Sequence, residues 1–179
     1  MSRKSERGVN LVELVAVLVV AGIAIPVLLA MWANISWRSV GSENIADAAS
    51  FARALMENVK SKRFDQSIDS PWTSSANLGV DPGEDSADAA TFNDVDDFIS
   101  STDAGIITPA PGYIRSVSAA YVYPNATNFW QDCTLPVNCA GMGNCTSCSQ
   151  CCYKRITVNV RRADGMLDNV NLTTVVAGY

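Results

Sequence analysis

An unbroken apolar run from Leu14 to Ala33 constrains this chain more than any other feature of its 179 residues. The run holds 20 uncharged residues, and a helix of that length spans about 30 Å, the hydrocarbon thickness of a membrane. Arg3, Lys4 and Arg7 precede it, and by the positive-inside rule they stay in the cytoplasm. The sequence therefore predicts a single-pass protein whose larger, C-terminal part lies outside the cytoplasm.

Two simpler explanations of the run are a cleaved secretory signal and a plain uncleaved anchor. A secretory signal has an apolar stretch of about 7–15 residues followed by a small-residue cleavage site. The run is longer, and bulky Trp32 makes the only nearby site a poor one. A plain anchor leaves Glu13 unexplained, because a carboxylate costs about 2.5–3.5 kcal/mol in mid-membrane and less near an end.

Glu13 therefore either lies near the membrane interface or is paired with a positive charge. If the chain is cut after Gly8, the new α-amino group belongs to Val9. Val9 and Glu13 are at positions i and i+4, which share one face of a helix. The pairing can form within one chain or between packed neighbours.

The N-terminal stretch resembles the signal of type IV prepilins and pseudopilins, which has basic residues, a Gly at the cleavage site, a Glu and a long apolar helix. In this chain Gly8 and Glu13 occupy those two positions. The resemblance implies that a prepilin peptidase/methylase of the bacterial inner membrane cuts between Gly8 and Val9 and methylates Val9. It implies that Glu13 registers the subunit among other pilin subunits in a helical filament. The C-terminus would lie in the periplasm before assembly, and the subunit in an extracellular pilus afterwards. Val9 stands where these proteins usually have Phe, and Pro26 lies one turn before their usual proline.

The fold class expected for the chain is α+β, with a long N-terminal helix packed on a small antiparallel sheet. The apolar positions from Val40 to Val59 recur mostly at steps of three and four, which predicts one helix from about residue 9 to 63. The expected parts are a cleaved leader (1–8), a transmembrane half (9–33) and an amphipathic half (34–63) of the helix, and a globular head (64–179). Within the head, alternating apolar residues predict strands at 113–123, 153–162 and 166–177, around a cysteine-rich insert at 124–152.

The segment from Phe64 to Ile114 has ten acidic residues and no Lys or Arg. It is typical of irregular surface with one short helix at most. Its carboxylates suggest Ca²⁺, but the motif of a calcium-binding loop is missing, so a solvated acidic loop and no metal site are expected. The segment from Phe92 to Phe98 is similar in sequence to one that follows the helix in minor pilins of the mannose-sensitive haemagglutinin type.

All six cysteines lie in the insert and its border, and an even count in an exported segment favours disulfides. Six cysteines allow 15 pairings, and the sequence does not choose among them. A four-thiolate zinc site, an iron–sulfur cluster and a redox-active pair are the alternatives. The disulfide candidates are Cys133, Cys139, Cys145, Cys148, Cys151 and Cys152.

The composition limits what the chain can do. There is no His, so the commonest general base and metal ligand is missing, and no catalytic constellation or cofactor is expected. The net charge of −5 argues against nucleic acid as a partner. The expectation is a non-enzymatic structural subunit, like a minor pilin, of a type IV pilus. The alternatives are a pseudopilin of a type II secretion system and a bitopic periplasmic protein with a metal- or redox-active cysteine cluster.

Overall fold

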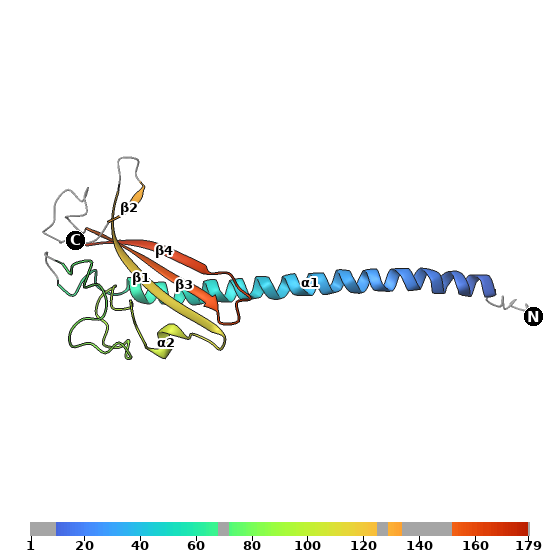
Figure 1. Cartoon of the computed structure of the whole chain (residues 1–179), viewed down its shortest axis with the longest axis horizontal. Coiled ribbons are helices and arrows are strands. Elements are labelled where there is room, and N and C mark those ends of the chain that lie inside the picture. The colour runs from blue at the N-terminus through green and yellow to red at the C-terminus, as the bar shows by residue number, and fades with distance from the viewer. Residues whose placement is uncertain (1–9, 68–71, 125–128, 134–151, 179) are drawn as a thin grey trace, which may run out of the picture. The chain divides into compact units, whose positions relative to one another are not determined.

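The computed structural model describes residues 10–67, 72–124, 129–133 and 152–178 of the chain (Figure 1). The chain divides into two compact units, residues 1–43 and 44–179, and the first helix contributes to both. The elements are helices α1 (Leu11–Lys60) and α2 (Ala104–Ile107) and strands β1 (Tyr113–Pro124), β2 (Trp130–Asp132), β3 (Tyr153–Arg162) and β4 (Val170–Ala177).

The described part of the first unit is the N-terminal part of α1. The backbone N–H of Leu14 donates to the carbonyl of Asn10 at 3.1 Å, so the helical pattern starts one turn before Glu13. Pro26 lies inside the helix without ending it. Large apolar side chains along this part are exposed; Leu18, for example, is 64% exposed. A helix that is apolar on all sides is typical of a membrane span or of a fully packed interior.

The second unit is built on a four-stranded antiparallel sheet in the order β2-β1-β3-β4. The central pair, β1 and β3, places Val117 opposite Val158, and Val158 in turn lies opposite Leu172 of β4. In Figure 1 the strands lie over the C-terminal part of α1. The fold is therefore α+β, with a long helix packed against an antiparallel sheet.

The core of the head lies between α1 and the sheet. Every second residue of β3 faces inward, and Ile156, Val158 and Val160 are fully buried. The helix contributes one face with steps of three and four, formed by Ala48, Ala52, Leu55, Met56 and Val59. The apolar pattern of the sequence begins earlier, at Val40, but Val40 and Ile45 are each 53% exposed, so the face that packs in the core begins at Ala48.

The acidic segment between α1 and β1 closes the core from the side, which the sequence pattern did not indicate. Its described residues, 61–67 and 72–112, form no long element, as expected, and include the short helix α2. However, Phe92, Val95 and Phe98 are at most 2% exposed and pack in the same apolar cluster as the helix and the sheet. The rings of Phe92 and Phe98 meet edge to face at 5.2 Å. The segment is therefore structural as well as acidic.

Two details of the sheet differ from the expected strands. The last strand begins at Val170 and not at residue 166, because residues 163–169 connect β3 to β4. Gly165 has a φ of 71°, a conformation that favours glycine, and its N–H donates to the carbonyl of Arg162 at 3.3 Å. Strand β2 lies inside the expected insert and pairs with the end of β1, with Asp132 opposite Val122. The sheet thus has four strands where three were expected.

Candidate functional site

The expected processing and assembly residues lie at or beyond the start of α1. Glu13 is in the first turn of the helix, where a carboxylate is favoured by the helix dipole. Gly8 and Val9 are outside the described residues, so the cut between them and the pairing of the Val9 amine with Glu13 stay predictions.

The apolar surface that follows Glu13 has no cover within the described chain. The helix contains an 18-residue window of mean hydropathy 2.9, none of which is buried. By length and composition this helix can cross a membrane, although an N-terminal signal sequence meets the same test. Exposed Leu, Ile and Val side chains need lipid or another apolar surface around them. The first unit is therefore an anchor or signal by its chemistry.

The expected disulfide candidates are only partly within the described residues. Cys133 follows β2 and Cys152 precedes β3, and neither is a free thiol. Cys139, Cys145, Cys148 and Cys151 lie outside the described residues. A disulfide-rich insert therefore stays a prediction, as do its pairings.

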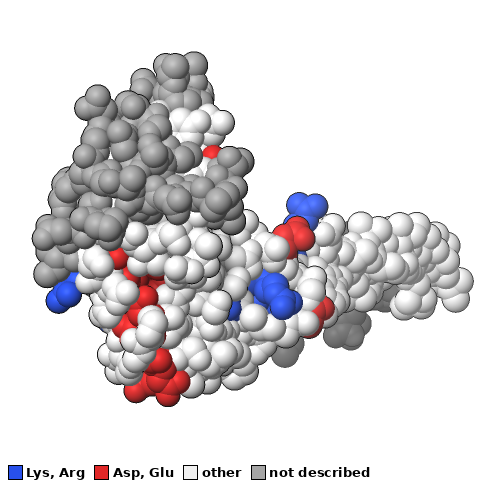
Figure 2. All heavy atoms as spheres, turned by 60° about the vertical axis from the view of Figure 1, so that its left-hand side comes forward, with Lys and Arg blue, Asp and Glu red and all other residues white. Residues whose placement is uncertain are grey.

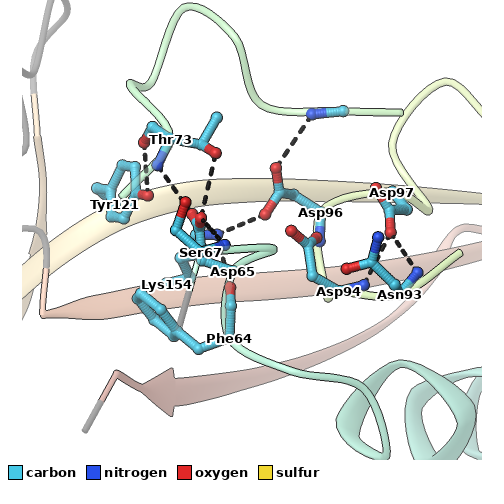
Figure 3. Close-up of polar contacts among 11 residues, drawn as sticks. Phe64, Asp65, Ser67, Thr73, Asn93, Asp94, Asp96, Asp97, Tyr121 and Lys154 are labelled. Atoms are coloured by element: carbon cyan, nitrogen blue, oxygen red, sulfur yellow. Dashed lines mark hydrogen bonds and ion pairs between the residues drawn. The ribbon is translucent and has the colours of Figure 1, made fainter. Parts of the chain in front are cut away.

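A buried ionic cluster in the head was not expected from the sequence, and Figure 3 shows it. Its centre is Lys154, whose side chain is fully buried. The ammonium donates to the carbonyl of Phe64 at 2.6 Å, to Oδ2 of Asp65 at 3.1 Å and to Oδ1 of Asp96. An ammonium has three protons, so these three acceptors use all of its donor capacity. The ring of Phe64 also lies 4.7 Å from the ammonium nitrogen.

The two carboxylates that accept from Lys154 also hold the backbone around them. Asp65 Oδ1 accepts from the N–H of Ser67 at 3.1 Å, and its Oδ2 accepts from the N–H of Thr73 at 2.9 Å. Asp96 Oδ2 accepts from the N–H of Gly79 at 3.2 Å. Every oxygen of both carboxylates therefore has a donor, as buried charges require.

Three neighbouring aspartates, Asp81, Asp94 and Asp97, each have one buried carboxylate oxygen that accepts no hydrogen bond. Asp94 Oδ1 accepts from the N–H of Asp96 at 2.9 Å, and Asp97 Oδ2 accepts from the N–H groups of Asn93 and Asp94 at 2.7 and 2.8 Å. The remaining oxygens, Asp94 Oδ2 and Asp97 Oδ1, are buried without a hydrogen-bond partner. The same holds for Oδ2 of Asp81, a residue that is half-buried overall.

Burial changes the titration of these three groups. Desolvation, together with the nearby charge of Asp96, raises the pKa of Asp94 to about 8. Desolvation likewise raises the pKa of Asp97 to about 6, and the pKa of Asp81 is raised for the same reason. In the absence of a cation, protons on these carboxyls would relieve their mutual repulsion.

The expectation of a solvated acidic loop is therefore right for part of the segment and wrong for the rest. Asp85 and Asp88 are exposed, and Figure 2 shows carboxylates gathered in one area of the head surface. Asp94, Asp96 and Asp97 are at most 1% exposed. The buried acids lie in the segment from Phe92 to Phe98, whose apolar residues pack in the core. Because the acids lie between these residues in the chain, they are buried as well.

The sequence does contain one signal for the buried position of Lys154. It has the same parity as the buried residues Ile156, Val158 and Val160 of β3, so the alternation alone places it inward. Arg115 has the same relation to the inward residues of β1, and it is 7% exposed. A lysine at an inward strand position requires acidic partners, although the sequence does not say which of the ten they are.

Comparisons with known proteins give no family to this chain: no family model, no curated protein and no solved structure matches it. The architecture itself, a long N-terminal apolar helix with a four-stranded antiparallel sheet packed on it, is pilin-like.

Proposed function

We propose that this chain is a structural, minor pilin-like subunit of a type IV pilus, made as a precursor and assembled through its N-terminal helix. The observation that carries the proposal is the difference in burial between the two parts of α1. Its C-terminal part is buried in the head through Ala48, Ala52 and Leu55, whereas its N-terminal part exposes apolar side chains all round. One continuous helix thus serves as the spine of a folded head and as an uncovered apolar segment.

Glu13 supplies the specificity that an apolar segment lacks. Apolar helices pack in lipid without a fixed register, because their side chains resemble the lipid tails chemically. A single carboxylate near the start of the helix is stabilised where it meets a positive group, and the new amine of Val9 on a neighbouring subunit is such a group. The partners in this proposal are the prepilin peptidase/methylase, other pilin subunits and the inner membrane, and the subunit performs no catalysis.

The proposal is tested by the mature N-terminus and by one substitution. Intact-mass and N-terminal analysis of membrane-extracted chain should find N-methyl-Val9 as the first residue. Glu13→Ala should leave membrane insertion intact and reduce incorporation into sheared filaments to background. Glu43→Ala removes an exposed carboxylate from the same helix and is the matched control, which should incorporate normally. Normal incorporation of Glu13→Ala, or an uncut N-terminus, would contradict the proposal.

The same N-terminus would serve a pseudopilin of a type II secretion system. The filament fraction decides between them, because a pilus subunit is recovered in extracellular sheared filaments and a secretion pseudopilin is retained with the cell envelope.

A further inference from the structure

The described residues of the head include two overlapping groups of three aspartates, and the ammonium of Lys154 lies in one of them. Asp65, Asp94 and Asp96 form the first group, and Asp81, Asp94 and Asp97 form the second. In each group, one carboxylate oxygen from each residue lies within 4.8 Å of the others. The ammonium of Lys154 lies in the first group, bound to Asp65 and Asp96.

Lys154 has no capacity left for the second group. Its three protons go to Phe64, Asp65 and Asp96. Within the described residues, no Lys or Arg donates a hydrogen bond to Asp81, Asp94 or Asp97. The five aspartates of the two groups thus face one buried ammonium.

The second group also has unused ligand atoms. Asp94 and Asp97 are each 0% exposed, and each has one buried oxygen that accepts no hydrogen bond; the Glu84 carboxylate beside Asp97 is a further acceptor and not a donor. Asp81 contributes a third such oxygen, Oδ2. In each of Asp94 and Asp97 the other oxygen is fixed by a backbone N–H, so the orientation of the carboxylate is set before any ligand arrives. A buried, unpaired carboxylate oxygen is costly unless a cation or a proton takes its lone pairs.

From this geometry we propose that Asp81, Asp94 and Asp97 form a binding site for a hard divalent cation, with Ca²⁺ as the preferred ion. Ca²⁺ binds oxygen ligands at about 2.3–2.6 Å, so two oxygens on one ion lie at most about 5 Å apart. The spacing within the group meets that limit. Mg²⁺ binds at about 2.0–2.1 Å in a near-ideal octahedral arrangement, whereas Ca²⁺ accepts irregular sets of oxygens such as three carboxylates from a segment without helix or strand.

The position of the site explains how an ion would enter and what it would do. Asp81 is half-buried and so marks the edge nearest to solvent, whereas Asp94 and Asp97 lie inside. Asp81 and Asp97 are separated by 16 positions, and the stretch between them forms no helix or strand. A bound ion would therefore link two stretches of the acidic segment to each other, beside the Lys154 cluster that links this segment to β3.

Calcium binding should be measured on the full chain in detergent after dialysis against chelator, by calorimetric titration with CaCl₂ and by metal analysis after re-dialysis. One Ca²⁺ per chain is expected. Asp94→Asn should raise the dissociation constant by about tenfold or more, because affinity follows the ligand charge. Asp88→Asn, an exposed acid of the same segment, should bind as the parent chain does.

Asp81→Asn covers the case in which Asp94→Asn fails to fold, because Asp81 is at the rim and its loss leaves the interior intact. It should weaken binding in a chain whose circular dichroism is unchanged. The proposal is overturned if the parent chain binds no Ca²⁺ at millimolar concentration, or if Asp88→Asn weakens binding as much as Asp94→Asn does. The site is independent of the proposed function, so Glu13→Ala should bind Ca²⁺ normally whether or not it enters filaments.

Discussion

The replacement of Lys154 by Met should cost the head a large part of its stability. The change removes three hydrogen bonds and the positive charge, but keeps most of the side-chain volume. It leaves two carboxylates, Asp65 and Asp96, buried and uncompensated, with side chains 0% and 2% exposed. Loss of one partner from a buried ion pair costs about 3–5 kcal/mol. Domains of this size are stable by about 5–15 kcal/mol, so about a fifth or more of the total is at stake.

Urea unfolding of the full chain in detergent, followed by tryptophan fluorescence, measures this loss. Trp72 is the reporter, because it is 5% exposed and packs edge to face on Phe64 at 4.9 Å. The other three tryptophans, Trp32, Trp37 and Trp130, are exposed and are first replaced by Phe, so that their emission does not mask that of Trp72.

Two further variants make the result specific to the buried charge. Lys60→Met removes an exposed lysine whose ammonium lies 3.9 Å from Glu57, and it should cost less than about 1 kcal/mol. Combining Lys154→Met with Asp96→Asn should recover part of the loss, because one of the two stranded charges is then neutral. A loss below about 1 kcal/mol for Lys154→Met alone would refute the reasoning, since it would mean that the cluster is hydrated or rearranges without cost.

Three other changes test the packing and the acids of the head by the same unfolding assay. Gly178→Ala should cost about 1–3 kcal/mol, because a Cβ there would lie 2.7 Å from Cη2 of Trp72, and an unchanged midpoint would show that the ring moves freely. Arg115→Met should cost about 2–3 kcal/mol, because its guanidinium donates to the carbonyls of Phe51, Gly105 and Ile106; a neutral result would mean that water replaces it. In chelator, stability should fall as pH rises from about 4 to 8, because burial raises the pKa of Asp94 to about 8 and the folded state binds the extra proton. With saturating Ca²⁺ that fall should shrink or reverse, and a pH profile that rises over this range in chelator would contradict the assignment.

Much of the architecture could be predicted from two periodicities. The steps of three and four after Val40 predict the helix, and the alternation around Ile156 and Val158 predicts the strand at the centre of the sheet. The apolar pattern starts at Val40 and the buried face of the helix only at Ala48, because an apolar pattern does not say where the head begins to cover the helix. Strand β2 is three residues long with every residue exposed, so no alternation of apolar residues marks it.

The buried ionic cluster was harder to predict, for a physical reason. Lys154 is separated from Asp65 by 89 positions and from Asp96 by 58, and no short-range pattern relates residues that distant. Composition was misleading as well, because ten acids without a base favour a solvated segment. The base that pairs with them lies in another element. Parity along the strand was the one available clue that Lys154 faces inward.

The acids of this segment have a structural use that accounts for both their number and the proposed ion site. A buried segment with little helix or strand must satisfy its backbone N–H groups in another way, and short acidic side chains accept from N–H groups a few positions away. Asp65 accepts from Ser67 and Thr73, Asp97 accepts from Asn93 and Asp94, and Asp103 accepts from Gly105 at 2.6 Å at the start of α2. Each carboxylate that holds a turn with one oxygen brings a second oxygen with it. Asp65 and Asp96 bind the ammonium of Lys154 with an oxygen each, whereas no group of the described residues donates to the second oxygens of Asp94 and Asp97. Carboxylates that hold the turns of a buried segment therefore leave further buried oxygens that a cation stabilises. Lys154 binds those of Asp65 and Asp96, and the proposed Ca²⁺ would bind those of Asp94 and Asp97.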